Sequence, residues 1–239
     1  MGEGEETNIQ EETIQYKDQE GNNIWNFFFG GEYDVGTQPE NYRRAGCPEK
    51  PMTCKTGKTS AIYTHWGSQE CNPQSTEVYR GYVGGGHFSH FGGINNPLCL
   101  PDAPEYNEEL TTDGGGERSN LYGAEYQTNT YSPWSSSHDK DMICAVCLTK
   151  GRSTNLMIPA KRTCPEGWTK EYEGLLMGGH HSHAGGHESI CVDINPEGRP
   201  GSMADLDGML FFPVIGICGS LPCTPYIANR ELACVVCTR

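Results

Sequence analysis

The sequence predicts an all-β protein made of two tandem copies of one disulfide-rich module, which follow an acidic N-terminal arm. Three observations lead to this prediction. An internal repeat recurs at a spacing of 93 residues, the cysteines keep the same order in both copies, and short segments rich in aromatic and β-branched residues alternate with turn residues. With 31 glycines and 15 prolines in 239 residues, we expect long loops between short strands.

The repeat is clearest in two stretches that are rich in glycine and histidine. Residues 79–93 and 172–186 match at a constant offset of 93, with nine identities and no gap, and both contain Gly-Gly-His-x-Ser-His-x-Gly-Gly. This match predicts module 1 at residues 47–150 and module 2 at residues 151–239, with Gly151 and Arg152 at the joint. Residues 1–46 form the arm.

Strands are expected where aromatic and β-branched residues gather between Gly, Pro, Asn and Asp. No segment in either module has a convincing helical period. The clearest predicted strands are Glu77–Val83, Asn155–Ala160, Thr169–Met177 and Met209–Ile217.

The cysteine content indicates an oxidising compartment. The chain has 12 cysteines, an even number, and cytosolic thiols stay reduced, so we predict a secreted, extracellular protein. No stretch approaches the roughly 20 apolar residues that a membrane-spanning helix needs, and we therefore predict no membrane span.

Each module ends in a Cys-x-x-Cys pair with strand-forming residues inside it. Because residues i and i+3 of a strand point to opposite faces, each cysteine can reach a different neighbour. We predict nested disulfides, with swapped partners within a module as the alternative; zinc binding and a redox-active pair are less consistent with strand-forming interiors and local partners. The predicted pairs are Cys71–Cys147, Cys99–Cys144, Cys164–Cys237, Cys191–Cys234, Cys47–Cys54 and Cys218–Cys223.

The arm combines strong acidity with an aromatic cluster. Residues 1–40 contain ten acidic residues and one basic residue, a net charge of −9 out of −14 for the chain, and no basic stripe for nucleic acid is present. The aromatic cluster is costly to leave in water, so it should pack on its own module or on a neighbouring subunit. This predicted assembly cluster consists of Ile24, Trp25, Phe27, Phe28 and Phe29.

The two repeated loops place His87 and His90 in module 1 and His180 and His183 in module 2. One interpretation is that these imidazoles bond to the loop backbones and recur because both modules descend from one ancestor. The alternatives are a divalent metal site, since imidazole is a common metal ligand, pH-sensitive assembly, or binding of a ligand such as a sugar. No cofactor is required by any other feature of the sequence.

Enzyme motifs are absent from the sequence: it contains no Gly-x-Ser-x-Gly elbow, no P-loop and no His-Glu-x-x-His. We therefore expect no enzymatic activity. Two acidic stretches, residues 193–197 and 205–207, could supply oxygen ligands to calcium, although neither has EF-hand spacing.

Several motifs resemble the C-terminal non-collagenous domain of type IV collagen, and within that family the sponge short-chain (spongin) collagens and related marine-invertebrate proteins. The resemblance covers residues 47–239. It lies in the Cys-x-x-Cys pairs, in Cys164-Pro165-Glu166-Gly167-Trp168, and in the segments 122–126, 156–159, 180–183, 219–222 and 234–239.

The resemblance implies two β-rich modules related by a pseudo-twofold axis, the nested disulfide scheme, and a head that trimerises and joins matrix networks. Two features depart from the family. Module 1 has Cys47 and Cys54 upstream in place of the small extra loop that Cys218 and Cys223 form in module 2, and no Gly-x-y repeat is present for a triple helix.

From these observations we predict an extracellular structural or assembly protein that forms a homo-oligomer or binds other matrix proteins. The alternative hypothesis is a secreted ligand-binding module, lectin-like or metal-binding, that uses the two histidine loops.

Overall fold

The computed structural model describes residues 16–17, 23–25, 59–106 and 118–239. The chain divides into two compact units, Met1–Cys54 and Lys55–Arg239. In the first unit, strands β1 (Tyr16–Lys17) and β2 (Asn23–Trp25) pair in an antiparallel manner. Phe27, Phe28 and Phe29 of the predicted assembly cluster lie outside the described residues, as does the predicted Cys47–Cys54 pair, so both remain predictions.

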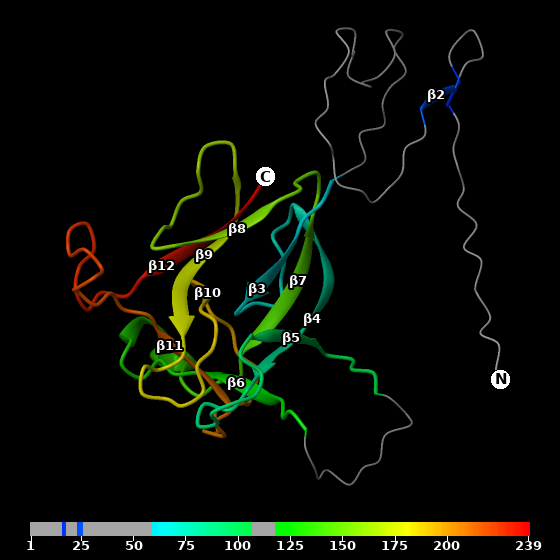
Figure 1. Cartoon of the computed structure of the whole chain (residues 1–239). Coiled ribbons are helices and arrows are strands. Elements are labelled where there is room, and N and C mark those ends of the chain that lie inside the picture. The colour runs from blue at the N-terminus through cyan, green and yellow to red at the C-terminus, as the bar shows by residue number, and fades with distance from the viewer. Residues whose placement is uncertain (1–15, 18–22, 26–58, 107–117) are drawn as a thin grey trace, which may run out of the picture. The chain divides into compact units, whose positions relative to one another are not determined.

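The second unit confirms the predicted fold class, because its described residues form a ten-stranded sheet (Figure 1). The only helical element in the described part of this unit is η1, a short 3-10 turn at Ser132–Ser137, which the sequence analysis did not predict. The strands are β3 (Ile62–Trp66), β4 (Ser75–Gly85), β5 (Leu98–Pro101), β6 (Tyr122–Tyr126), β7 (Ile143–Thr149), β8 (Asn155–Pro159), β9 (Thr169–Gly178), β10 (Ile190–Asp193), β11 (Met209–Pro213) and β12 (Ala233–Thr238).

The predicted strands agree closely with the observed ones except at one end. The segment 77–83 lies within β4, and β8, β9 and β11 begin at the predicted residues. The strand predicted to reach Ile217 instead ends at Pro213. Beyond Pro213 the Val214 N–H still donates to the Leu176 carbonyl at 2.9 Å, and Ile215 forms only an isolated bridge with Glu231.

The strands of the two modules pair in the same way. In module 1, β4 pairs with β5, β6 and β7, and β3 pairs with β7. In module 2, β9 pairs with β10, β11 and β12, and β8 pairs with β12. Two parallel contacts, β6 with β11 and β3 with β10, connect the modules and close the sheet into a ring of strands. An origin by duplication and a pseudo-twofold axis stay predictions.

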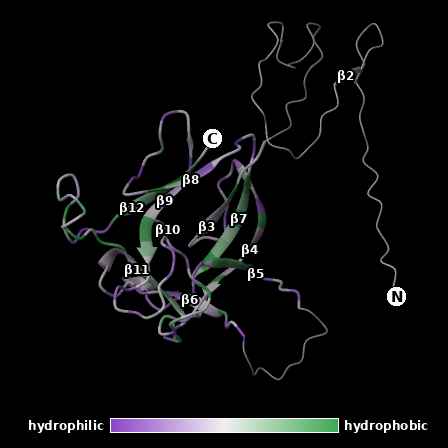
Figure 2. Ribbon diagram, viewed as in Figure 1, coloured by the Kyte–Doolittle hydropathy of each residue, from purple (hydrophilic) through white to green (hydrophobic). Residues whose placement is uncertain are grey.

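The core is shared between the modules. One cluster packs Tyr126 and Met142 of module 1 with Met177 and Phe211 of module 2, and these four side chains are almost fully buried. A second cluster likewise draws on both modules. Hydrophobic residues run along β7 and β9, which lie on opposite sides of the ring in Figure 2. Because neither module buries these side chains alone, the two depend on each other for stability.

The structure contains the nested disulfide pairs and not the swapped alternative. Cα atoms of the paired residues lie 5.4–5.8 Å apart, within the usual range. All ten cysteines in the described ranges are bonded, which leaves no thiolate among them for zinc or redox chemistry. Closing loops of 45 and 76 residues stabilises the fold by about 4 kcal/mol each on the chain-entropy model. The pairs are Cys71–Cys147, Cys99–Cys144, Cys164–Cys237, Cys191–Cys234 and Cys218–Cys223.

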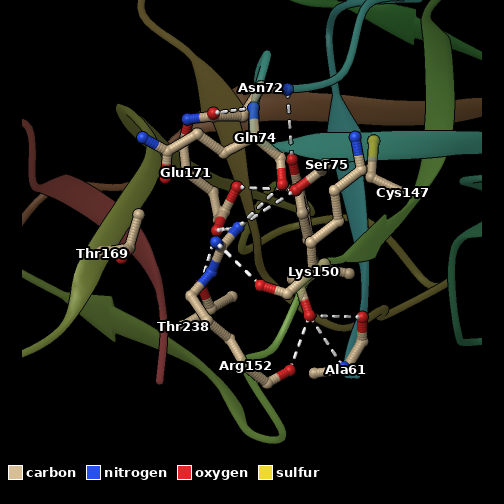
Figure 3. A network of polar contacts seen from close by, with 12 residues as sticks. Ala61, Asn72, Gln74, Ser75, Cys147, Lys150, Arg152, Thr169, Glu171 and Thr238 are labelled. Atoms are coloured by element: carbon tan, nitrogen blue, oxygen red, sulfur yellow. Dashed lines mark hydrogen bonds and ion pairs between the residues drawn. The ribbon is translucent and has the colours of Figure 1, made fainter. Parts of the chain in front are cut away.

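A buried ion pair holds the joint between the modules (Figure 3). The guanidinium of Arg152 donates to Glu171 Oε1 at 2.8 Å, and the Glu171 side chain is 0% exposed. Thr238 donates to the same oxygen at 2.5 Å, and the Ser75 hydroxyl donates to the other oxygen at 3.2 Å. Every carboxylate oxygen of this glutamate therefore has a donor, and the donors come from both modules.

Candidate functional site

The histidine loops follow corresponding strands and adopt the same turn. Loop 1 (residues 86–93) follows β4, and loop 2 (residues 179–186) follows β9. In loop 1 the His90 N–H donates to the carbonyl of His87 at 3.1 Å, and in loop 2 the His183 N–H donates to the carbonyl of His180 at 3.0 Å. The repeated sequence thus gives a repeated local conformation.

The two loops contact each other directly. The N–H of Gly185 in loop 2 donates to the carbonyl of Phe88 in loop 1 at 2.8 Å. A Cβ atom at Gly185 would lie 2.6 Å from the His87 carbonyl oxygen, so only glycine permits this approach. The rings of Phe88 and His183 also meet, with centroids 4.6 Å apart. The repeated motif therefore forms an interface between the modules within one chain.

Each histidine pair packs on an aromatic side chain from a neighbouring strand. His87 and His90 lie 4.8 Å apart and contact Tyr122 at the start of β6, with ring centroids 5.0 and 5.6 Å away. His180 and His183 lie 5.1 Å apart and contact Phe212 of β11 at 5.0 and 5.4 Å. The four histidines therefore come together as two aromatic stacks, one for each module.

His87 and His180 each contact the serine two residues further along the loop through Nδ1. The Ser89 N–H donates to His87 Nδ1 at 3.3 Å, and the Ser182 N–H donates to His180 Nδ1 at the same distance. The serine hydroxyls lie within 2.9 Å of the same nitrogens. These contacts support a role in holding the loop backbones.

His183 is the member of this group with an unusual environment. Its Nδ1 atom is buried and has no hydrogen-bond partner. Burial, and then the positive charge that His180 can carry, lower the pKa of the His183 imidazole below its usual value. The ring is therefore neutral at physiological pH and packs as an aromatic group.

The two loops enclose only a small space. A cavity of about 10 Å³, lined by residues that include His87, His187 and Met209, lies there. That volume corresponds to roughly one water molecule. Among the described residues, the histidines also form no group of three converging metal-ligand atoms. The predicted metal or ligand site at these histidines therefore stays a prediction.

A second candidate surface lies at the free edge of strand β8. Within the unit Lys55–Arg239, the described strands that pair with a single neighbour are β5 and β8. On β8, Leu156 and Met157 are 43% and 36% exposed, and beside them a groove of about 210 Å³ is lined by residues that include Tyr63 and Trp66. An exposed apolar edge strand offers unpaired backbone groups to another strand.

The structure also brings together three carboxylates that the sequence analysis did not group. Glu125, Asp139 and Asp205 each place one oxygen within 4.8 Å of the others. Asp205 belongs to a stretch that the sequence analysis named as a source of calcium ligands, but Glu125 and Asp139 lie 80 and 66 residues before it. The spacing of these three residues along the sequence could not reveal the group, because they come together only through the pairing of β6 with β11.

No protein-family model matches the chain. Among the described residues, no helix is long and apolar enough to cross a membrane.

Proposed function

We propose that this chain is an extracellular structural protein whose disulfide-locked head self-associates, with a structural rather than a catalytic role. The disulfides support a secreted location because they persist in oxidising compartments. The shared core and the two inter-module strand contacts make one rigid head of the two modules. The resemblance to collagen non-collagenous heads agrees with this role.

The observation that carries the proposal is the free edge of β8. All its residues except Ile158 are exposed, and Leu156 and Met157 place apolar surface beside the unpaired edge. Monomeric proteins usually protect such an edge with charge or cover it. We propose a second copy of this chain as its partner, because the aromatic cluster at residues 24–29 gives every copy an apolar segment that needs a surface.

Analytical ultracentrifugation of the oxidised, full-length protein tests the proposal. We expect the parent protein to form a defined oligomer, and Leu156→Lys to shift it to monomer because a charge on the edge opposes strand pairing. Ile217→Lys is the matched control, since Ile217 is 62% exposed and lies outside the sheet. A monomeric parent protein, or an oligomer unchanged by Leu156→Lys, would overturn the assignment.

A parallel pair of variants examines the arm separately. If the aromatic cluster contributes to assembly, Trp25→Ser and Phe28→Ser should each weaken the oligomer without changing the near-ultraviolet circular dichroism of the disulfides. If they leave the oligomer unchanged while Leu156→Lys dissociates it, the β8 edge of each head pairs with another head and not with the arm.

A further inference from the structure

Three acidic side chains that are far apart in the sequence meet at one end of the paired strands β6 and β11. Glu125 lies on β6, Asp139 follows η1, and Asp205 precedes β11. The parallel pairing places Leu210 opposite Glu125, which brings the segment that contains Asp205 next to β6. One oxygen of each carboxylate lies within 4.8 Å of the others.

Glu125 is the member that points to a ligand. The residue is 2% exposed, and its Oε1 atom accepts the backbone N–H of Leu206 at 3.1 Å. Its Oε2 atom is buried and has no partner. Buried carboxylate oxygens in native proteins are almost always hydrogen-bonded or bound to a metal, because burial without a partner is costly. The side chain of Glu125 thus has one buried acceptor atom without a donor.

The neighbouring charges do not compensate Glu125. Arg199 pairs with Asp141 at 2.5 Å, and His138 lies 3.2 Å from Asp139. Burial is the largest cause that raises the pKa of the Glu125 carboxyl, to about 7, and the charges of Asp141 and Asp205 add to it. The backbone N–H groups of Leu206 and Asp207 oppose the shift and do not cancel it. A cation bound between the carboxylates would favour the charged form instead.

We propose that Glu125, Asp139 and Asp205 bind a calcium ion. The donors are all carboxylate oxygens, which suit a hard cation, whereas zinc prefers nitrogen and sulfur. Oxygens bound to one calcium at 2.3–2.6 Å can lie up to about 5 Å apart, so the spread of these three fits a single ion. Asp205 is exposed, which leaves room for water molecules to complete the coordination shell.

The ion would act as a cross-link between the modules. Glu125 and Asp139 belong to module 1, and Asp205 belongs to module 2. Binding would therefore hold the segment before β11 against β6, in addition to the strand pairing. Because the ion binds the folded state and not the separated carboxylates, it should raise the melting temperature of the head.

Isothermal titration calorimetry on the oxidised, full-length protein freed of metal by chelation tests the site, with CaCl₂ and MgCl₂ as separate titrants. We expect one calcium ion to bind with a Kd no weaker than about 10⁻³ M, and magnesium to bind more weakly. Calcium should also raise the melting temperature by a few degrees, to an extent that grows with its concentration.

Glu125→Gln is the decisive variant because it keeps the size of the side chain and removes its charge. We expect it to weaken calcium binding at least tenfold, whereas Glu166→Gln, at an exposed turn outside the group, should bind as the parent does. Near-ultraviolet circular dichroism verifies that both variants fold. No saturable binding up to about 10 mM calcium, or equal affinity in Glu125→Gln, would overturn the proposal.

Discussion

Two buried glutamates of this domain, Glu171 and Glu125, have opposite environments. Glu171 receives hydrogen bonds on both carboxylate oxygens, from Arg152, Thr238 and Ser75. Glu125 has one oxygen with a backbone donor and one with no partner. Both residues lie where module 1 meets module 2, so their position between the modules does not explain the difference.

Glu171 carries a buried charge that the protein itself neutralises, whereas Glu125 carries one that is left for a ligand. At Glu171 the chain itself supplies an arginine and two hydroxyls, so the buried charge is neutralised without any bound species. At Glu125 the chain supplies further carboxylates, and burial therefore favours the protonated form until a cation arrives. Substitutions at the two sites should consequently change stability in opposite directions.

The largest change in the free energy of unfolding is expected at Glu171, where both carboxylate oxygens have donors. Arg152→Ala leaves the Glu171 carboxylate buried without its cation, and it should lower the free energy of unfolding by about 3–5 kcal/mol. Urea denaturation of the oxidised protein measures this loss. Arg80→Ala is the control, because Arg80 is 53% exposed and pairs with Asp102 at 3.9 Å, an interaction worth less than about 1 kcal/mol.

A double variant distinguishes loss of the ion pair from loss of packing. Arg152→Met with Glu171→Met removes both charges and keeps much of the volume, so it should recover most of the stability that Arg152→Ala loses. If the free energy of unfolding of Arg152→Ala is within about 1 kcal/mol of the parent value, water replaces the guanidinium and the network does not depend on the ion pair.

A smaller and opposite effect is expected at Glu125 in metal-free buffer. Its folded pKa is raised from 4.5 to about 7, so its favourable contribution is fully present below pH 4.5 and is lost as the pH rises through about 7. The glutamine side chain of Glu125→Gln cannot ionise, so this variant should not lose stability as the pH rises. Thermal unfolding of both proteins between pH 4.5 and 8 measures it, and we expect the variant to be the more stable one at pH 8. If the stabilities of the two proteins change with pH in the same way, the Glu125 carboxylate is solvated in the folded state.

Local sequence patterns predicted much of the fold, because short strands and cysteine spacing are local signals. The segments that became β8, β9 and β11 begin at the predicted residues. The opposite faces of a strand predicted separate partners for the two cysteines of each Cys-x-x-Cys pair, and the structure has the nested pairing and not the swapped one. The 3-10 turn η1 was missed because six residues around a proline give no helical period. The parallel strand pairings between the modules are not marked by any local sequence pattern either.

The candidate sites likewise divide into features that the local sequence predicts and features that depend on how the strands pack. The histidine motifs were visible as a repeat, but their contact with each other depends on how the modules pack. The carboxylate group was invisible because its members are separated along the chain and meet through the β6–β11 pairing. Buried residues from distant segments can be grouped only after strand order is known.

The smallest effect should come from His183, whose Nδ1 atom is, with Glu125 Oε2, one of two buried side-chain polar atoms without a partner among the described residues. Burial lowers the pKa of His183, so its contribution to stability is fully present above the unfolded value of 6.5 and is lost as the pH falls from there through the lowered pKa of the folded state. Intrinsic amide exchange slows as the pH falls from 7.5 to 5.5. The exchange rates of loops 1 and 2, divided by the intrinsic rates, should therefore show an excess at pH 5.5 over pH 7.5. His183→Asn should remove that excess, whereas His181→Asn, an exposed change on the same loop, should keep it. An excess that survives His183→Asn would assign the acid response of the loops to other groups.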